Sequence, residues 1–273
     1  MFNILFWNLK RNSIEEYIID CIIENNIDIA VFSEFDGIDF IKIEKNLGKM
    51  YSRILAIQDD KKVTLIAKTT FSVTNVQPQG RYSIYKIETA VKNYLLAAVH
   101  LEDRRNYQTA DRIDTIQHLV ADIEQTEELF KCSNTIVIGD FNANPYDEEL
   151  LSKYAFNAVL FKTIIDKSEF KNPKTSKRKR FYNPILHYIS EDTEMYGSFY
   201  HGETSMTPYW HCLDQVLVRK CLANTINHVE YLKKINAKDL LKNSIPNKKI
   251  SDHLPLLVNL QEVENGVWKL LGN

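Results

Sequence analysis

The stretch TIVIGDFNANP, residues 135–145, opens with a short run rich in β-branched side chains and then turns abruptly polar. An apolar run of this length, bounded by Gly139, predicts a buried strand. The strand ends at an acid, Asp140, and an amide, Asn142, follows two residues later. Alone, Asp140 is explained by an Asx turn, in which the carboxylate accepts a hydrogen bond from nearby backbone. A functional interpretation therefore needs partners elsewhere in the chain.

Five other predicted strands carry a polar residue of the same kinds at one end. Their apolar runs place these strands at residues 2–9, 28–32, 94–99, 213–218 and 254–260. The polar residues at their ends are Asn8, Glu34, His100, Asp214, Asp252 and His253. Loops on a rigid scaffold are the usual place for binding and catalysis, so this repetition predicts one site along a rim of the sheets.

The remaining pattern predicts a mixed α/β protein. Helical spacing of apolar residues predicts a long helix at about residues 107–130, and Ser13 followed by Glu16 predicts a capped helix near the start. Further strands are predicted at residues 51–57, 63–67, 71–76 and 82–88, at hairpin-like spacing. The pattern loosens at about residues 166–210, which we expect to be a surface insertion in a single catalytic domain covering residues 1–273.

Composition favours a globular protein without a general affinity for nucleic acid. The chain has 273 residues, 44% of them hydrophobic, with a formal net charge of −2 and a pI of about 6.4. Any nucleic-acid binding therefore requires a local basic patch. Four scattered cysteines form no CxxC pair, and no apolar stretch is long enough to insert across a membrane. We expect a soluble, reduced, cytoplasmic protein, and the sequence leaves its protein partners unknown.

Three residues of the predicted rim suit a hard divalent cation. Glu34 and Asp252 offer carboxylate oxygens and Asn8 offers an amide oxygen, and these are the ligands that Mg²⁺ or Mn²⁺ prefers. Without partners, Glu34 is better explained as a solvated loop acid and Asn8 as a turn former.

The other rim residues suit the hydrolysis of a phosphate ester. His253 beside a buried acid such as Asp214 would be held in one tautomer and could carry a proton. Asp140 could orient or deprotonate a water molecule, and Asn142 could donate a hydrogen bond to a phosphate oxygen. Together with a cation, these groups are what in-line attack of water on a phosphate ester requires.

Six motifs, in their order along the chain, resemble the endonuclease/exonuclease/phosphatase superfamily. They are WNL (7–9), SEF (33–35), VHLE (99–102), GDFNANP (139–145), LDQVLV (213–218) and SDHLPL (251–256). GDFN followed by a downstream SDH is specific in combination, although either motif alone is weak. The superfamily includes deoxyribonuclease I, abasic-site endonucleases, RNA deadenylases, sphingomyelinases and inositol polyphosphate 5-phosphatases. The resemblance implies a four-layer α/β sandwich, in which two packed mixed β-sheets are flanked by helices.

The resemblance also implies a role for each rim residue. The implied metal ligands are Glu34, Asn8 and Asp252, with Glu34 as the main one. The implied catalytic residues are Asp140, Asn142, His253, His100 and Asp214. Asp214 would orient His253, and either Asp140 or His253 would accept the proton of the attacking water. His100 matches a histidine that can protonate the leaving oxygen in the deoxyribonuclease branch, with Glu88 or Glu102 as its candidate partner. The abasic-site branch usually has tyrosine there, and a tyrosine or similar residue where this chain has Gln215, so abasic-site repair is disfavoured.

The predicted insertion and one arginine of the long helix are candidates for substrate binding. Residues 167–180 form a basic run whose only acid is Glu169. A solvated loop and a contact with a phosphate backbone are about equally good explanations of that run. RFYNP (180–184), with WHCLDQVLV (210–218), resembles a pattern of bacterial superfamily members. The expected substrate-binding residues are Arg112, Arg180, Tyr182 and Asn183, although the aromatic residues could instead pack the insertion on the core.

Three functions remain open at this point. The first is a Mg²⁺-dependent nuclease that hydrolyses phosphodiester bonds in DNA or RNA, with the nucleic acid as its partner. The second is a phosphatase or phosphodiesterase that acts on a small or lipid phosphoester, such as an inositol phosphate. The third is a catalytically silent binding module, which the full set of rim residues disfavours.

Overall fold

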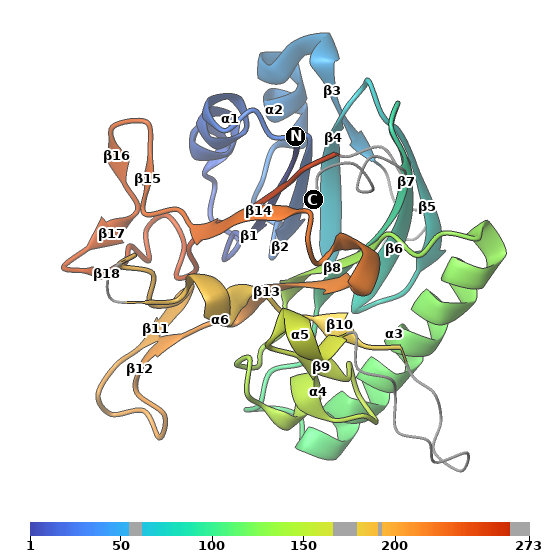
Figure 1. Ribbon diagram of the computed structural model, residues 1–273. Helices are drawn as coiled ribbons and strands as arrows, with labels where there is room; N and C mark the ends of the chain where they lie inside the picture. Colours follow the sequence, from blue (N-terminus) through green and yellow to red (C-terminus); the bar gives the residue numbers. More distant parts are fainter. Residues whose placement is uncertain (55–61, 166–178, 191–192, 263–273) are drawn as a thin grey trace, which may run out of the picture.

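Two large mixed β-sheets form the centre of the protein (Figure 1). The structure is a computed structural model that describes residues 1–54, 62–165, 179–190 and 193–262. The six-stranded sheet has the order β14 (Ile226–Tyr231), β19 (Leu256–Leu260), β1 (Phe2–Asn8), β2 (Ile29–Ser33), β4 (Val63–Lys68) and β3 (Tyr51–Ile54). The seven-stranded sheet has the order β5 (Ser72–Pro78), β6 (Tyr82–Glu88), β7 (Asn93–His100), β8 (Thr135–Asp140), β13 (Asp214–Arg219), β10 (Phe181–Tyr182) and β9 (Ala158–Val159).

The two sheets pack face to face through apolar side chains. One cluster of buried residues contains side chains from both sheets, among them Phe2, Tyr94, Ile136 and Val216. The rings of Phe2 in β1 and Tyr94 in β7 are stacked with their centroids 4.7 Å apart. Burial of apolar surface between the sheets is the main stabilising contribution to this arrangement.

Helices cover the outer faces of both sheets. The helices α1 (Glu15–Glu24) and α2 (Phe40–Leu47) pack on the six-stranded sheet through residues such as Ile18 and Ile43. The long helix α3 (Thr109–Phe130) packs on the seven-stranded sheet through a stripe that includes Leu119 and Ile123. The result is the predicted four-layer α/β sandwich, so the fold class is confirmed.

The start of α1 differs from the predicted capping box. The N-cap residue is Ile14, and no side chain caps the helix. Ser13 instead donates a hydrogen bond from its hydroxyl to the carbonyl oxygen of Gly37, at 2.9 Å. The hydroxyl therefore joins the loop before α1 to the loop after β2, a tertiary contact that local sequence does not reveal.

The remaining elements lie at the edges of the sandwich. Short helices are α4 (Glu148–Leu151), α5 (Lys162–Ile165) and α6 (Ile185–Tyr188), and the 3₁₀ turns are η1 (Gly48–Met50) and η2 (Lys220–Leu222). Three hairpins pair β11 (Phe199–His201) with β12 (Tyr209–His211), β15 (Lys234–Ile235) with β16 (Lys238–Asp239), and β17 (Leu241–Lys242) with β18 (Ile245–Pro246). Among the residues that the structure describes, no helix has the combined length and apolar character needed to cross a membrane.

The predicted surface insertion at about residues 166–210 is only partly described. Residues 166–178 and 191–192, which include most of the basic run, lie outside the described residues. The part that follows is not a surface appendage, because Phe181 and Tyr182 form β10 of the seven-stranded sheet and are buried. For Phe181 and Tyr182 the prediction of a surface position is therefore wrong, because both side chains are buried in the core.

Strand direction brings the polar strand ends to one rim. β1 and β2 are parallel with Asn8 opposite Ser33, and β7 and β8 are parallel with His100 opposite Asp140. β13 is antiparallel to β8 and begins with Asp214 directly opposite Asp140. β19 is antiparallel to β1, so the turn before β19 lies beside the end of β1.

Candidate active site

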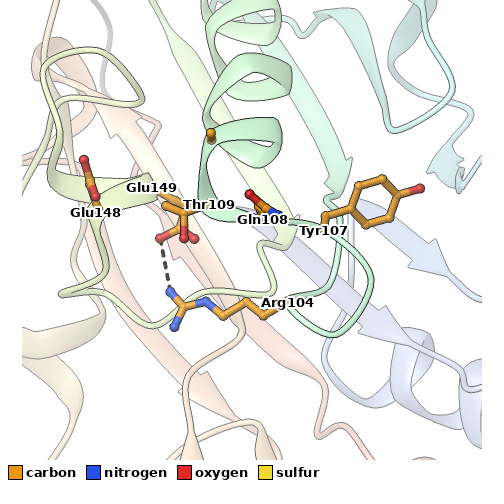
Figure 2. Close-up of a pocket in the computed structure, with 7 residues that line it drawn as sticks. Arg104, Tyr107, Gln108, Thr109, Glu148 and Glu149 are labelled. Carbon is orange, nitrogen blue, oxygen red and sulfur yellow. Dashed lines mark hydrogen bonds and ion pairs between the residues drawn. The ribbon is translucent and has the colours of Figure 1, made fainter.

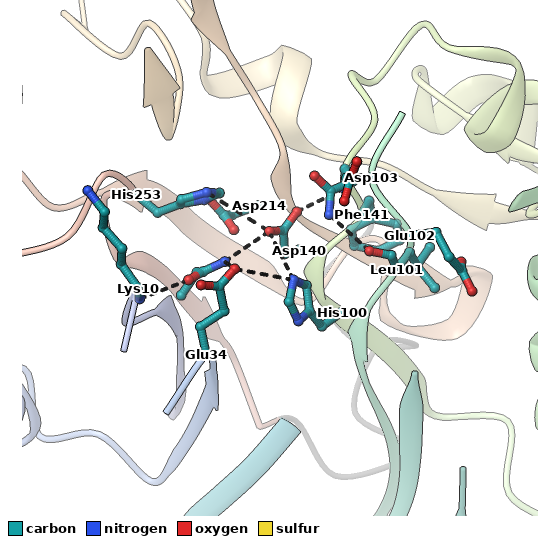
Figure 3. Close-up of polar contacts among 12 residues, drawn as sticks. Lys10, Glu34, His100, Leu101, Glu102, Asp103, Asp140, Phe141, Asp214 and His253 are labelled. Atoms are coloured by element: carbon teal, nitrogen blue, oxygen red, sulfur yellow. Dashed lines mark hydrogen bonds and ion pairs between the residues drawn. The ribbon is translucent and has the colours of Figure 1, made fainter. Parts of the chain in front are cut away.

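Two buried acids and a histidine form the centre of the rim (Figure 3). Asp214 Oδ2 lies 2.7 Å from His253 Nδ1, and Asp140 Oδ2 lies 4.0 Å from His253 Nε2. All three side chains are buried. One side-chain oxygen or ring nitrogen from each of the three lies within 4.8 Å of the others.

The charged groups of this cluster shift one another's pKa values. Burial raises the pKa of the Asp140 carboxyl, and the negative charge of Asp214 raises it further. Burial alone would lower the pKa of His253, but the carboxylates of Asp214 and Asp140 outweigh burial and raise the pKa to about 10. His253 is therefore an imidazolium at neutral pH, and it donates from Nδ1 to Asp214 while Nε2 faces Asp140.

Asn8 connects the two sheets at this rim. Its amide nitrogen donates to Asp140 Oδ2 at 3.1 Å and lies 3.4 Å from Glu34 Oε1. Its amide oxygen accepts a hydrogen bond from the backbone nitrogen of Lys10 at 3.0 Å. Asn8 therefore bridges two acids, and only the remaining lone pair of its oxygen is left for a cation.

His100 faces the same acids from the end of β7. Its Nε2 lies 3.8 Å from both Glu34 Oε1 and Asp140 Oδ2. Neither candidate partner contacts it: Glu88 lies at the opposite end of the β6–β7 ladder, and Glu102 pairs with Thr115 and Arg81. His100 Nδ1 is buried and has no hydrogen-bond partner among the described residues. The histidine that the sequence identified is thus brought to the site without the expected glutamate.

Two site residues hold a backbone conformation that is uncommon outside glycine. Glu34 has a φ of 48° and Asn142 a φ of 49°, both in the left-handed region. The backbone nitrogen of Asn142 donates to Asp140 Oδ1 at 2.8 Å, and its side-chain amide donates to the carbonyl oxygen of Leu101 at 2.9 Å. The Asx turn considered for Asp140 is therefore present, and it coexists with the buried acid cluster.

The turn before β19 places Asp252 and His253 as neighbours with different surroundings. Asp252 is partly exposed and lies 3.5 Å from Lys10 Nζ, whereas His253 points into the cluster. Ser251 holds the turn, since its hydroxyl donates to the carbonyl oxygen of Asn8 at 2.6 Å and accepts from the backbone nitrogen of His253 at 3.0 Å. Asp252 and Glu34 thus present carboxylates at the solvent side of the rim, while Asp140 and Asp214 lie beneath them.

Three of the four predicted substrate-binding residues are buried within the protein. Arg112 is 1% exposed, Tyr182 is 2% exposed and Asn183 is fully buried. Asn183 donates to Gln215 Oε1 at 2.7 Å, and Gln215 donates to the carbonyl oxygen of Ala143 at 2.6 Å. These side chains are used inside the fold, so the expectation that they touch substrate is wrong for this structure. Arg112 and Asn183 support the loop after β8 instead, and Tyr182 packs in the core between the sheets.

The fourth, Arg180, is partly exposed but lies at the wrong end of the sheet. It precedes β10, and Phe181 of β10 pairs with Arg219 at the last residue of β13, whereas Asp214 is the first. Five residues of extended strand separate the two ends by roughly 17 Å. Lys179 is anchored at the same far end, where its ammonium contacts Glu127 at 2.9 Å. The described end of the basic run therefore lies away from the acid cluster.

Two residues outside the set of predicted site residues also lie at the site. Lys10 directly follows the WNL motif and places its ammonium beside Asp252. Phe199 of the β11–β12 hairpin packs on the ring of His253, with the centroids 4.8 Å apart. The position of Lys10 next to a rim motif was an available signal, whereas the contact of Phe199 depends on how a distant hairpin folds back.

Comparisons with known proteins show the fold. No family model and no curated protein matches the sequence. Among solved structures, an AP endonuclease from Archaeoglobus fulgidus superimposes with a TM-score of 0.60 at 18% identity, covering 96% of this chain and 100% of that one. TDP2 from D. rerio, complexed with a single-strand DNA product, gives 0.58 at 13% identity over 94% and 97% of the two chains. The 3′ phosphatase NExo from Neisseria, bound to a product DNA hairpin, gives 0.56 at 15% identity over 96% and 100%. The chain therefore has the deoxyribonuclease I-like fold that the sequence motifs implied.

Proposed function

We propose that this protein is a divalent-metal-dependent phosphoesterase, and specifically a nuclease that hydrolyses phosphodiester bonds in DNA or RNA. The observation that carries the proposal is the buried Asp214–His253 pair beside Asp140, with Glu34, Asn8 and His100 on the same rim. A positively charged imidazolium beside a buried carboxylate suits an anionic substrate: the imidazolium can bind the anion, and the carboxylate can activate the attacking water molecule.

The surroundings of the two candidates for the general base support Asp140 over His253. His253 already carries its proton at neutral pH, because Asp214 raises its pKa to about 10. It therefore serves as a positive donor to a non-bridging phosphate oxygen. Asp140 has a raised pKa caused mainly by burial, which makes it a stronger base than an ordinary carboxylate. We assign to Asp140 the role of orienting the attacking water and accepting its proton.

His100 and Asn142 complete the polar surround. His100 Nε2 lies within 4 Å of both Glu34 and Asp140, at the side of the cluster opposite His253, where a proton can be delivered to the leaving oxygen. The Asn142 side-chain amide, which now donates to Leu101, has a second N–H that can be offered to a phosphate oxygen.

The donor set at the mouth of the site fits a hard cation. Glu34 and Asp252 are carboxylates at the solvent side of the rim, and the Asn8 oxygen retains a free lone pair. These three residues would hold Mg²⁺ or Mn²⁺, which when bound would neutralise charge on the phosphate. A soft or thiolate-preferring metal is a poor match, because the ligands are oxygens.

A nucleic-acid substrate is supported by the fold relatives. The titles of the D. rerio TDP2 and Neisseria NExo structures name bound DNA products, and both proteins superimpose over nearly all of this chain. The Archaeoglobus fulgidus relative is named an AP endonuclease, but His100 and Gln215 occupy positions where the abasic-site pattern has tyrosine. We therefore favour a nuclease that does not require an abasic site.

Cleavage of a substrate panel tests the proposal. Supercoiled plasmid, linear duplex, single-stranded DNA and RNA are incubated with Mg²⁺, with Mn²⁺ and with chelator. Asp140→Asn removes the base with little change of volume, and Asp36→Asn removes a nearby acid that is exposed to solvent and pairs with Arg11. We expect metal-dependent cutting that Asp140→Asn abolishes and Asp36→Asn leaves intact.

The other outcomes separate the alternative functions. Turnover of inositol phosphates or other small phosphoesters, with no cutting of any nucleic acid, would replace the nuclease assignment by a phosphatase or phosphodiesterase. No turnover of any phosphoester by folded protein saturated with metal would leave a binding module on the same fold.

A further inference from the structure

A buried arginine lies behind the active site at the beginning of α3. Arg112 is 1% exposed, and its guanidinium contacts three separate segments of the chain. Nε donates to the carbonyl oxygen of Glu102 at 2.9 Å, in the loop after β7. Nη2 donates to the carbonyl oxygens of Phe141 at 3.2 Å and Asn142 at 2.8 Å, in the loop after β8.

Glu149 balances the buried charge from a third segment. It stands in α4, is 1% exposed, and forms a short charge-assisted hydrogen bond with Arg112 Nη1. Its other oxygen accepts from Arg104 at 3.1 Å, and Figure 2 shows Arg104 reaching Glu149 along a surface pocket. The buried arginine is thus neutralised by one carboxylate, and that carboxylate is held from both sides. A buried ion pair whose arginine also donates to three backbone carbonyl oxygens is costly to break.

The two loops that Arg112 joins carry the catalytic candidates. The loop after β7 begins at His100, and the loop after β8 contains Asp140 at its start and Asn142 in its left-handed conformation. Parallel strand pairing alone ends at His100 and Asp140, so the chain beyond that pair needs other contacts to stay in register. The guanidinium supplies two such contacts, to the carbonyl oxygens of Phe141 and Asn142.

We propose that Arg112, neutralised by Glu149, is a positioning residue: it clamps the loop after β8 to the loop after β7, and so fixes Asn142 and Asp140 relative to His100. This inference rests on the proposed phosphoesterase function. Arginine is the residue type that the position requires, since its planar group offers five donors in fixed directions. A lysine would keep the charge opposite Glu149, but one ammonium cannot reach four acceptors on three segments.

The chain offers a matched control for the cost of altering a buried arginine. Arg219 is 3% exposed, pairs with the buried Glu127 at 2.7 Å, and donates to the carbonyl oxygen of Lys179 at 2.7 Å. It stands at the end of β13 that is remote from Asp214. Arg219→Lys therefore changes a buried ion pair of the same kind without touching a loop of the active site.

The test compares Arg112→Lys with Arg219→Lys in the full-length protein. Thermal unfolding, kcat and KM on a cleaved oligonucleotide, and hydrogen exchange of residues 100–104 and 139–144 are measured for both. We expect comparable losses of Tm for the two variants. Only Arg112→Lys should lose kcat, by at least ~10-fold with KM within ~2-fold, because displacement of a catalytic group costs transition-state stabilisation more than binding. Only Arg112→Lys should exchange faster in the two peptides.

A milder variant and the exchange measurement keep the test decisive. Glu149→Gln retains the side-chain shape and weakens the pair, so it should change kcat and exchange in the same direction by a smaller amount. Equal kcat and exchange in wild type and both clamp variants would overturn the inference, as would an equal kcat loss in Arg219→Lys. If the wild-type protein cleaves no phosphoester, the proposed function fails, and hydrogen exchange still decides whether Arg112 holds the loops.

Discussion

Replacing Gly139 by alanine should separate β7 from β8 at the point where both strands deliver a site residue. A Cβ atom built at Gly139 lies 2.0 Å from the carbonyl oxygen of Val99 and 2.7 Å from its Cγ2 atom. Gly139 also has a φ of 156°, a backbone conformation that residues with a side chain rarely adopt. Val99 and Gly139 are direct partners in the parallel ladder, one residue before His100 and Asp140.

The size of the effect follows from the movement needed. Contact distances below 3.0 Å are essentially never observed for a Cβ atom, so the strands must move apart by at least about 1 Å. Overpacking of this kind costs roughly 1–3 kcal/mol, and each buried hydrogen bond that is lost adds roughly 1 kcal/mol. The bond from Leu101 N to the Asp140 carbonyl oxygen, at 2.9 Å, lies directly beyond the clash. Together these give a loss of roughly 2–4 kcal/mol in the free energy of unfolding.

Thermal unfolding and cleavage assays measure the two consequences. We expect Tm to fall by about 10 °C, since 1 kcal/mol corresponds to roughly 2–4 °C in a chain of this size. Cleavage should be lost even at temperatures where the variant is folded, because His100 and Asp140 are moved apart. Gly202→Ala is the control, since a Cβ atom there meets nothing within 4 Å. A Gly139→Ala protein with wild-type Tm and activity would refute the argument.

Three further predictions concern charge. The folded-state pKa of His253, about 10, lies above its ordinary value of 6.5, so the stabilisation is complete below about pH 6.5 and is lost as pH rises toward 10. Urea unfolding at pH 6 and pH 9.5 should show this loss in wild type, and a much smaller one in Asp214→Asn. Lys10→Gln removes the ammonium that competes with Mg²⁺ for the Asp252 carboxylate, so cleavage should saturate at a Mg²⁺ concentration lower by about 2- to 5-fold. An unchanged Mg²⁺ titration would contradict this competition. Arg180→Gln should leave KM and the salt dependence of cleavage unchanged, since Arg180 lies at the far end of β13. A flatter salt dependence would show that Arg180 does contact the substrate.

The rim could be predicted from sequence because strand ends are local features. Apolar runs locate the strands, and an acid, amide or imidazole at the end of each run is visible without any tertiary information. Parallel pairing of β1 with β2 and of β7 with β8 then brings those ends together. The four-layer arrangement came from the motif resemblance rather than from periodicity, and the sheet order confirms it.

The prediction of the substrate-binding residues failed because the type of a side chain does not reveal which way it faces. The position of Arg112 on a helix near the rim suggested a phosphate ligand. In the structure its side chain points inward and donates to the backbone carbonyl oxygens of Glu102 and Asn142. Tyr182 and Asn183 sit in a segment without clear periodicity, which suggested an insertion, yet a two-residue strand is too short to show any period. Arg180 has the right chemistry at the wrong end of the sheet, a property that only strand register decides.

The pairing of β1 with β19 has a consequence for biosynthesis. β1 lies between β2 and β19, so one of its two neighbours is made roughly 250 residues after it. Trp7, whose indole nitrogen donates to the carbonyl oxygen of His253 at 3.0 Å, is separated from that residue by almost the whole described chain. A growing polypeptide can build the helices and the β5–β8 segment first, but contacts of such long range form late. β19 must therefore emerge from the ribosome before it can pair with β1 and bring His253 to Asp140 and Asp214. Until then the nascent chain has an incomplete six-stranded sheet and an incomplete active site.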